Sequence, residues 1–170
     1  TTTTVTEDYL SEKFPMVEME HNIMINASFL PNEELVETIM SLSENQAIFK
    51  DEDAIAFYTK DSQDDVNLET YESIEFDYDV LTVTRTWDIF SKNDEAIRAD
   101  FELLTKDRTS QPIPKSNNII GAEHIFIEEG AKVEFATLNA STGPIYIGKD
   151  AEIMEGSLVR GPLALCEHAT

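Results

Sequence analysis

A short polar segment after a predicted strand offers the first groups that could do chemistry. The apolar run Ile23-Met24-Ile25 is followed directly by Asn26-Ala27-Ser28, which supplies an amide and a hydroxyl. Loops at the carboxyl ends of strands are where open α/β sheets bind their ligands. The segment from Asn26 to Phe29 is therefore the first candidate ligand site. A plain polar loop and helix cap is the alternative interpretation.

The net charge of the chain limits the classes of molecule that it is expected to bind. The 34 acidic and 12 basic residues give a net charge of −22. Such a charge repels nucleic acid and anionic membranes, so we expect neither as a partner. A small phosphate-bearing molecule remains a possible ligand, because a divalent cation can bridge carboxylates or amides to phosphate. The bland alternative is that a negative surface keeps the protein soluble. The acidic stretch at 61–65 is expected to be a loop.

Cysteine and histidine add little chemistry. The single cysteine, Cys166, allows no intramolecular disulfide and suits a reducing compartment, so we expect a cytoplasmic protein. No run approaches the roughly 20 apolar residues of a membrane span. The histidines do not share a metal-ligand spacing, and we assign no role to His21, His124 or His168. The chain opens with four threonines and no methionine, so we expect the natural N-terminus to lie upstream.

The elements around the candidate loop follow from the apolar pattern. Residues 20–42 predict a strand, a loop and a helix in which Leu35 and Ile39 share a face. Asn32 is a suitable N-cap for that helix. A β-hairpin is expected next, from two apolar runs on either side of the turn formers Asp51-Glu52-Asp53. A second hairpin is predicted from the strand-like composition of residues 73–76 and 80–84.

A longer periodicity predicts an amphipathic helix that begins at Trp87. Its apolar residues recur at spacings of seven, four and three, at Phe90, Ile97, Phe101 and Leu104. The prolines in the run 111–114 lack backbone donors and cannot continue a helix. We therefore predict a partial α/β domain at 1–108, a linker at 109–118 and a different architecture at 119–170.

After the linker, apolar residues recur with a period of six. They fall at Ile127 and Val133 and, after two inserted residues, at Ile147, Ile153, Val159 and Leu165. Small residues such as Ala131 and Ala151 follow four positions later. This period predicts a parallel β-helix, in which each short strand points one aliphatic side chain inward. A pair of ordinary hairpins would not explain the small residues. Such coils need several repeats, so we expect more beyond residue 170.

Two runs carry a family resemblance. Residues 87–101, WDIFSKNDEAIRADF, and the run from Gly143 through Ile147-Gly148-Lys149-Asp150 to Gly161-Pro162 are similar to a Bacteroidetes family of bifunctional enzymes. These are UDP-N-acetylglucosamine diphosphorylase/glucosamine-1-phosphate N-acetyltransferases, often labelled glucose-1-phosphate thymidylyltransferases. The resemblance covers nearly the whole chain from about Thr6. It implies the rear part of an α/β, Rossmann-like nucleotidyltransferase domain, followed by the first coils of a left-handed parallel β-helix of hexapeptide repeats.

The resemblance also implies an activity. A nucleoside triphosphate and a sugar 1-phosphate would condense, with Mg²⁺, to a nucleotide sugar of the UDP-N-acetylglucosamine or dTDP-glucose type, and pyrophosphate would be released. An acetyltransferase half that uses acetyl-CoA would lie mostly beyond residue 170, and β-helices of this family imply a homotrimer. The family's glycine-rich nucleotide loop and its lysine have no match here, so the chain would hold only part of the active site.

Four residues can be carried over from the family. Asn26 and Ser28 resemble a strand end where relatives carry a glycine and a metal-binding aspartate. No aspartate stands here, so these two residues would bond the sugar or hold a metal-bound water. Trp87-Asp88 with Asn93 resembles a motif whose asparagine lies near metal and phosphate. This implies that Asp88 contacts substrate and that Asn93 binds the metal, with helix capping as the alternative.

Two other functions stay open. The chain could belong to a hexapeptide-repeat acyltransferase whose α/β domain is degenerate, or to a non-catalytic trimeric scaffold. A glycine-rich strand and loop followed by a lysine upstream of this sequence would favour the nucleotidyltransferase.

Overall fold

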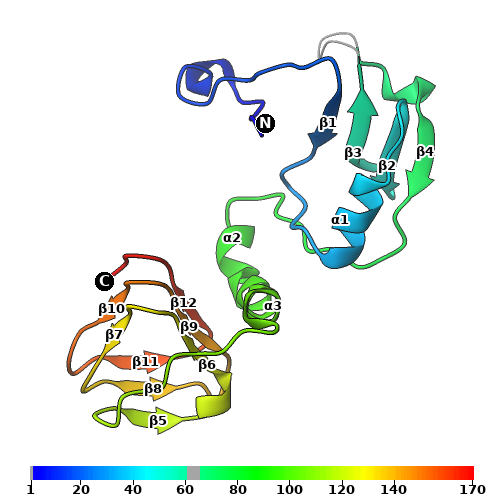
Figure 1. Ribbon diagram of the computed structural model, residues 1–170. Coiled ribbons are helices and arrows are strands. Elements are labelled where there is room, and N and C mark those ends of the chain that lie inside the picture. The colour runs from blue at the N-terminus through cyan, green and yellow to red at the C-terminus, as the bar shows by residue number, and fades with distance from the viewer. Residues whose placement is uncertain (1, 61–65) are drawn as a thin grey trace. The chain divides into compact units, whose positions relative to one another are not determined.

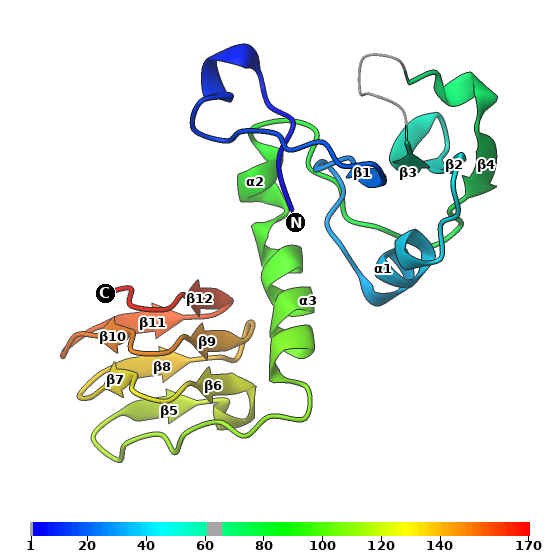
Figure 2. The same cartoon turned by 45° about the horizontal axis from the view of Figure 1, so that its top comes forward.

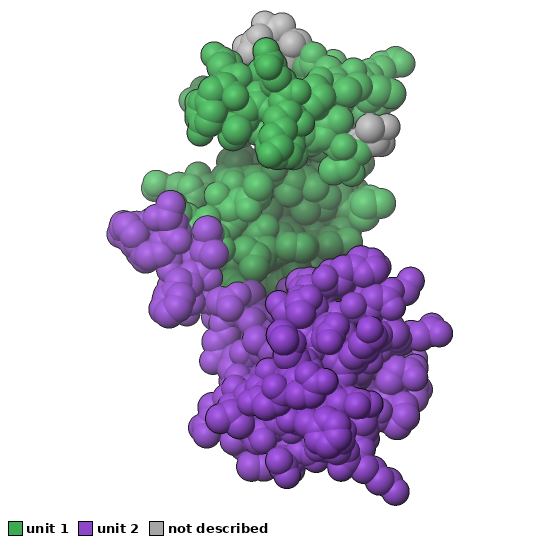
Figure 3. Space-filling model, turned by 90° about the vertical axis from the view of Figure 1, so that its left-hand side faces the viewer, with its two compact units in different colours: residues 1–84 green, residues 85–170 purple. Residues whose placement is uncertain are grey.

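The chain divides into two compact units. The computed structural model describes residues 2–60 and 66–170, and the expected loop at 61–65 lies outside this range. One unit spans Thr1–Thr84 and the other spans Arg85–Thr170 (Figure 3). Short 3₁₀ turns lie at Asp8–Leu10, Leu68–Thr70 and Ala122–His124. Each unit has its own hydrophobic core and is described separately.

A four-stranded mixed sheet forms the centre of the first unit (Figure 1). Its strands are β1 (Asn22–Ile25), β2 (Gln46–Lys50), β3 (Asp53–Thr59) and β4 (Glu72–Glu75). Their order is β1-β3-β2-β4. The predicted first hairpin is confirmed, because β2 and β3 pair antiparallel. β1 pairs antiparallel with the other side of β3, which makes β1 an edge strand.

One helix covers part of this sheet. α1 (Glu33–Met40) begins after Asn32, whose side chain accepts a hydrogen bond from the Leu35 backbone N–H at 2.8 Å. Side-chain capping of this kind satisfies a donor that the helix itself leaves unpaired. Leu35 and Ile39 are buried in one core cluster with Ile48 and Ile55 of the sheet. The predicted strand, loop and helix are confirmed, with Asn32 as the cap.

The predicted second hairpin is wrong. β4 lies parallel to β2, with Ile74 opposite Ile48, instead of pairing with the next segment. Residues 80–84, all within the described range, form no strand. They run beside the candidate loop, where Thr82 makes an isolated bridge with Phe29. Pairing with distant residues here overrides the local preference for strand.

The predicted amphipathic helix is two helices. α2 (Asp88–Ser91) and α3 (Asn93–Thr105) are separated at Lys92. The apolar side chains of the predicted face are also not all buried, since Phe90 is 89 % exposed and Leu104 is 47 % exposed. The helical periodicity therefore predicted the segment type, while the break and the exposure of its face depend on its surroundings.

Short parallel strands form three ladders in the second unit. The strands are β5 (Asn118–Ile120), β6 (Ile125–Ile127), β7 (Lys132–Val133), β8 (Thr137–Asn139), β9 (Ile145–Ile147), β10 (Glu152–Ile153), β11 (Leu158–Arg160) and β12 (Leu163–Leu165). They pair in the orders β5-β8-β11, β6-β9-β12 and β7-β10. Figure 2 shows the strands stacked in layers, one turn of the chain above the next. We call this arrangement the coil.

The side chains of the six-residue period fill the coil. Ile127, Val133, Ile147 and Ile153 are buried in a single cluster, and Val159 and Leu165 pack against it. The two residues in excess of the six-residue period between Val133 and Ile147 are not a single insertion. Leu138 is fully buried five residues after Val133, and Ile147 follows Leu138 by nine. One residue is therefore missing before β8 and three are added after it. The handedness of the coil stays a prediction.

The limits of the domains also stay a prediction. The division between the compact units falls after Thr84, whereas the expected linker is at 109–118. α2 and α3 belong to the second unit by packing. Among the described residues, no helix has the length and apolar character that crossing a membrane requires.

Candidate functional site

A cleft of about 310 Å³ in the first unit contains two of the four residues that the sequence analysis named. Both Asn26 and Ser28 line it. The other lining residues are Phe29, Lys50, Asp51, Asp53, Val80, Thr82 and Thr84. The cleft therefore joins the loop after β1, the turn between β2 and β3, and the segment before the second unit.

Strand pairing explains why these segments meet. Ile25, the last residue of β1, lies opposite Ala56 of β3, and the Asn26 N–H donates to the Ile55 carbonyl at 2.8 Å. Because β1 and β3 are antiparallel, the end of β1 lies beside the start of β3. The turn that joins β2 to β3 is thereby placed against the loop after β1.

Asn26 shapes the loop. Its Nδ2 donates to the Ala54 carbonyl at 3.1 Å, and its Oδ1 accepts from the Ser28 N–H at 3.0 Å. The first bond ties the loop to β3, and the second forms a local turn of the kind that asparagine favours. Within the described chain the Ser28 hydroxyl has no hydrogen-bond partner. Asn26 therefore fixes the backbone at Ser28, which lines the cleft.

The end of β2 and the β2–β3 turn supply another part of the cleft lining. The Lys50 ammonium donates to the Tyr78 carbonyl at 2.7 Å and lies 5.9 Å from the centre of the Phe76 ring. The carboxylates of Asp51 and Asp53 make no hydrogen bond within the residues that the structure describes. The sequence indicated these two only as turn formers. Their position in the cleft depends on the β1–β3 pairing, which has no local signal in the sequence.

Asp88 and Asn93 lie elsewhere. Both belong to the second unit, and neither lines the cleft. Asp88 is 9 % exposed, and its carboxylate accepts from the Arg85 N–H at 3.0 Å, at the start of α2. Asn93 is the exposed first residue of α3. This contact ties Asp88 to the segment just before α2, and the proposed substrate and metal roles of the two residues stay predictions.

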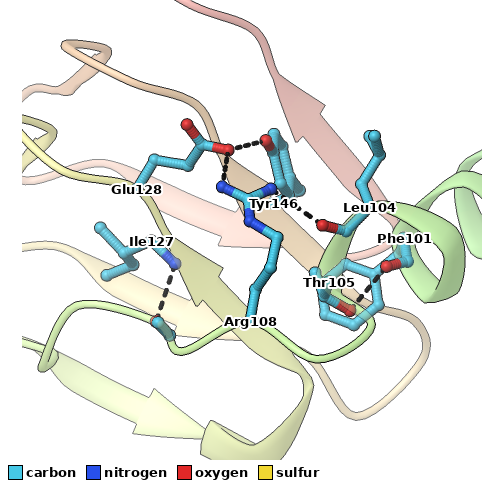
Figure 4. Close-up of polar contacts among 8 residues, drawn as sticks. Phe101, Leu104, Thr105, Arg108, Ile127, Glu128 and Tyr146 are labelled. Atoms are coloured by element: carbon cyan, nitrogen blue, oxygen red, sulfur yellow. Dashed lines mark hydrogen bonds and ion pairs between the residues drawn. The ribbon is translucent and has the colours of Figure 1, made fainter.

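A polar cluster holds α3 to the coil (Figure 4). Arg108 donates to the Glu128 carboxylate at 2.7 Å and to the Leu104 carbonyl at 2.8 Å. The Tyr146 hydroxyl donates to the same Glu128 oxygen. The Arg108 guanidinium also lies over the ring of Phe126, which stacks on Tyr146. The Tyr146 hydroxyl, followed by Arg108, holds the pKa of Glu128 below its usual range, and burial raises the pKa of Tyr146.

Comparison with known proteins identifies the family of the chain. A sequence model of a family described as sugar nucleotidyl transferase matches residues 1–109, more than half of the chain. The chain belongs to the sugar nucleotidyl transferase family. No curated protein matches it.

The part that matches the sugar nucleotidyl transferase family contains the whole cleft and also Asp88 and Asn93. Family membership supports a transferase whose substrates are nucleotides and sugar phosphates. The general resemblance found in the sequence is thus confirmed. The Bacteroidetes branch and its specific substrates stay predictions.

This sugar nucleotidyl transferase chain has few grouped side chains that could bind Mg²⁺ within its described residues. The described residues gather no group of three or more His, Cys, Asp or Glu side chains that could hold a metal. Mg²⁺ in nucleotide enzymes is commonly held by one or two carboxylates together with substrate phosphates. Mg²⁺, and Asn93 as its ligand, stay predictions.

Proposed function

We propose that the chain is part of an enzyme that joins a nucleoside triphosphate to a sugar 1-phosphate. The product is a nucleotide sugar of the UDP-N-acetylglucosamine or dTDP-glucose type. The main support is the family match over residues 1–109, a range that includes every residue that lines the cleft. Ser28 lines that cleft, and its hydroxyl has no hydrogen-bond partner among the described residues, which supports a site for a polar substrate.

In the proposed reaction an oxygen of the sugar 1-phosphate attacks the α-phosphorus of the nucleoside triphosphate. A new P–O bond forms, the bond to the bridging α,β oxygen breaks, and pyrophosphate leaves with the bonding electrons. Catalysis of such a transfer depends mainly on positioning and on neutralising charge. Mg²⁺, when bound, supplies the positive charge for the phosphates.

The chain's own residues would position the sugar phosphate. Asn26 holds the loop after β1 against β3, and Ser28 offers its hydroxyl to the sugar. Asp88 would contact substrate and Asn93 would bind the metal.

We further propose that the coil is the start of a left-handed parallel β-helix of hexapeptide repeats. The parallel ladders and the aliphatic side chains at the six-residue period support this. An acetyltransferase that uses acetyl-CoA would continue from it, and the coil would assemble a homotrimer.

The test is an assay of the full-length enzyme with UTP or dTTP and a series of sugar 1-phosphates. We expect pyrophosphate and a nucleotide sugar in equal amounts. The Ser28→Ala variant should raise KM for the sugar 1-phosphate, while Ser43→Ala, a change outside the cleft, should leave it unchanged. Acetyl transfer without any nucleotidyl transfer would contradict the proposal and favour an acyltransferase. The absence of both activities would favour a non-catalytic scaffold.

A further inference from the structure

We propose that the cleft binds the hydroxylated ring of the sugar 1-phosphate through the carboxylates of Asp51 and Asp53, and that the phosphate stays outside it. This inference rests on the proposed function and assigns one part of the substrate to one part of the site. It makes Asp51 and Asp53 specificity-determining residues of the β2–β3 turn.

Charge is the first reason to exclude phosphate. Two carboxylates line the cleft and face a single ammonium group, that of Lys50. That ammonium is already bonded to the Tyr78 carbonyl and lies near the Phe76 ring. A phosphate inside the cleft would therefore meet two negative charges and a cation that is already engaged, and like charges at such short range repel.

The available polar groups instead suit hydroxyl donors. A carboxylate only accepts hydrogen bonds, and its bonds from neutral donors are shorter and stronger than those between neutral groups. Asp51 and Asp53 have no hydrogen-bond partner for their carboxylates within residues 2–60 and 66–170. Ser28 adds a hydroxyl that can both donate and accept. A sugar ring carries several adjacent hydroxyls and is neutral, so it satisfies these groups without the cost of burying charge.

Size and shape agree with a single ring. A volume of about 310 Å³ lies at the low end of the range for small-molecule pockets. Phe29 and Val80 supply apolar lining next to the polar wall. A pyranose ring has the same mixture, with C–H groups on its faces and hydroxyls at its rim.

The first experiment is a titration of the ¹⁵N-labelled 170-residue chain followed by NMR. The probes are N-acetylglucosamine, glucose, inorganic phosphate and Mg²⁺, each added alone. We expect at least one of the two sugars to shift the amides of Asn26, Ser28 and Asp53, and inorganic phosphate to leave them in place. Shifts with phosphate, shifts with Mg²⁺ but no sugar, or no shifts with either sugar would each overturn the proposal.

The second experiment uses matched variants of the turn. Asp53→Asn keeps the size of the side chain and removes its charge, whereas Glu52→Gln makes the same change at the exposed residue beside it, which does not line the cleft. We expect Asp53→Asn to weaken sugar binding by the chain about tenfold, the loss expected when a charge-assisted hydrogen bond becomes a neutral one. Glu52→Gln should bind like the parent chain. Equal effects of the two variants would overturn the proposal.

In the full-length enzyme, Asp53→Asn should raise KM for the sugar 1-phosphate and leave KM for the nucleoside triphosphate unchanged. This readout separates the inference from the proposed function. An active transferase in which Asp53→Asn alters neither KM would retain the function and refute the role of the turn. An enzyme without nucleotidyl transfer that still binds the sugar through Asp53 would refute the function and retain the cleft as a sugar site.

Discussion

Arg108 and Glu128 form an ion pair of 2.7 Å that connects the chain just beyond α3 to the end of β6. Tyr146 donates to the same carboxylate from the neighbouring strand β9. Only 17 % of the Glu128 side chain is exposed, so solvent screens this pair less than a fully exposed one. The cluster therefore ties the helix to two layers of the coil.

This cluster predicts an acid-dependent loss of stability. The contacts with Tyr146 and Arg108 lower the pKa of Glu128 in the folded protein below the ordinary value of 4.5. A group with a depressed pKa stabilises the fold above its unfolded pKa, and this contribution disappears as the pH falls through the folded pKa. We expect Glu128→Gln to lower the melting temperature at pH 7, with a difference from the parent that shrinks as the pH falls through the depressed pKa of Glu128. Thermal melts across pH measure this, and Glu129→Gln at the neighbouring exposed position is the control. A constant difference at all pH values would contradict the role of ionised Glu128.

Asn26 and Ser28 should respond differently to truncation. Asn26→Ala removes two hydrogen bonds that join the loop to β3 and to itself, each worth about 1 kcal/mol. It should therefore lower the free energy of unfolding of the first unit. Ser28→Ala removes a hydroxyl that has no partner among the described residues, and should change this free energy by less than about 0.5 kcal/mol. Denaturant unfolding of both variants tests the division of roles, which is wrong if Ser28→Ala is the more destabilising change.

The coil should be sensitive to charge at Ile153. Its side chain is 7 % exposed and belongs to the core cluster, where a carboxylate would have no partner and would cost several kcal/mol. Ile153→Asp in the full-length protein should abolish soluble assembly. Glu155 is exposed, and Glu155→Lys should be tolerated. Thermal melting and size-exclusion chromatography compare them, and a parent-like Ile153→Asp protein would refute the predicted frame.

Catalysis by the full-length enzyme should require a divalent cation. A chain with a net charge of −22 repels a nucleoside triphosphate unless a cation offsets the phosphates. We expect EDTA to abolish pyrophosphate release and excess Mg²⁺ to restore it. Turnover that continues unchanged in EDTA would contradict the requirement for a divalent cation.

Local signals explain what the sequence could predict. The cap at Asn32 and the aliphatic period through Ile147 and Ile153 depend on residues close together in the chain, and the structure has both. Asn26 and Ser28 were predicted because they follow a strand; both line the cleft, and their roles stay predictions.

The remaining features depend on distant partners. The parallel pairing of β4 with β2 is set by packing across the sheet, whereas strand composition at residues 80–84 suggested a hairpin. Asp53 enters the cleft because β1 pairs with β3, about 30 residues further along the chain. The slip of the frame at Leu138 is likewise hidden, because its partners in the ladder, Ile119 and Val159, lie on neighbouring turns of the coil and not beside it in the sequence.

The position of α3 has a consequence for how such proteins can be recombined. The family match ends at residue 109, so by ancestry the helix goes with the transferase part. Its contacts instead join it to the coil. Arg98 of the helix donates to the Thr142 carbonyl, and Arg108, just beyond the helix, donates to Glu128. A chimaera joined at residue 109 would keep the helix and replace its acceptors. A module exchange that preserves both cores has to cut after Thr84 and transfer the helix together with the coil.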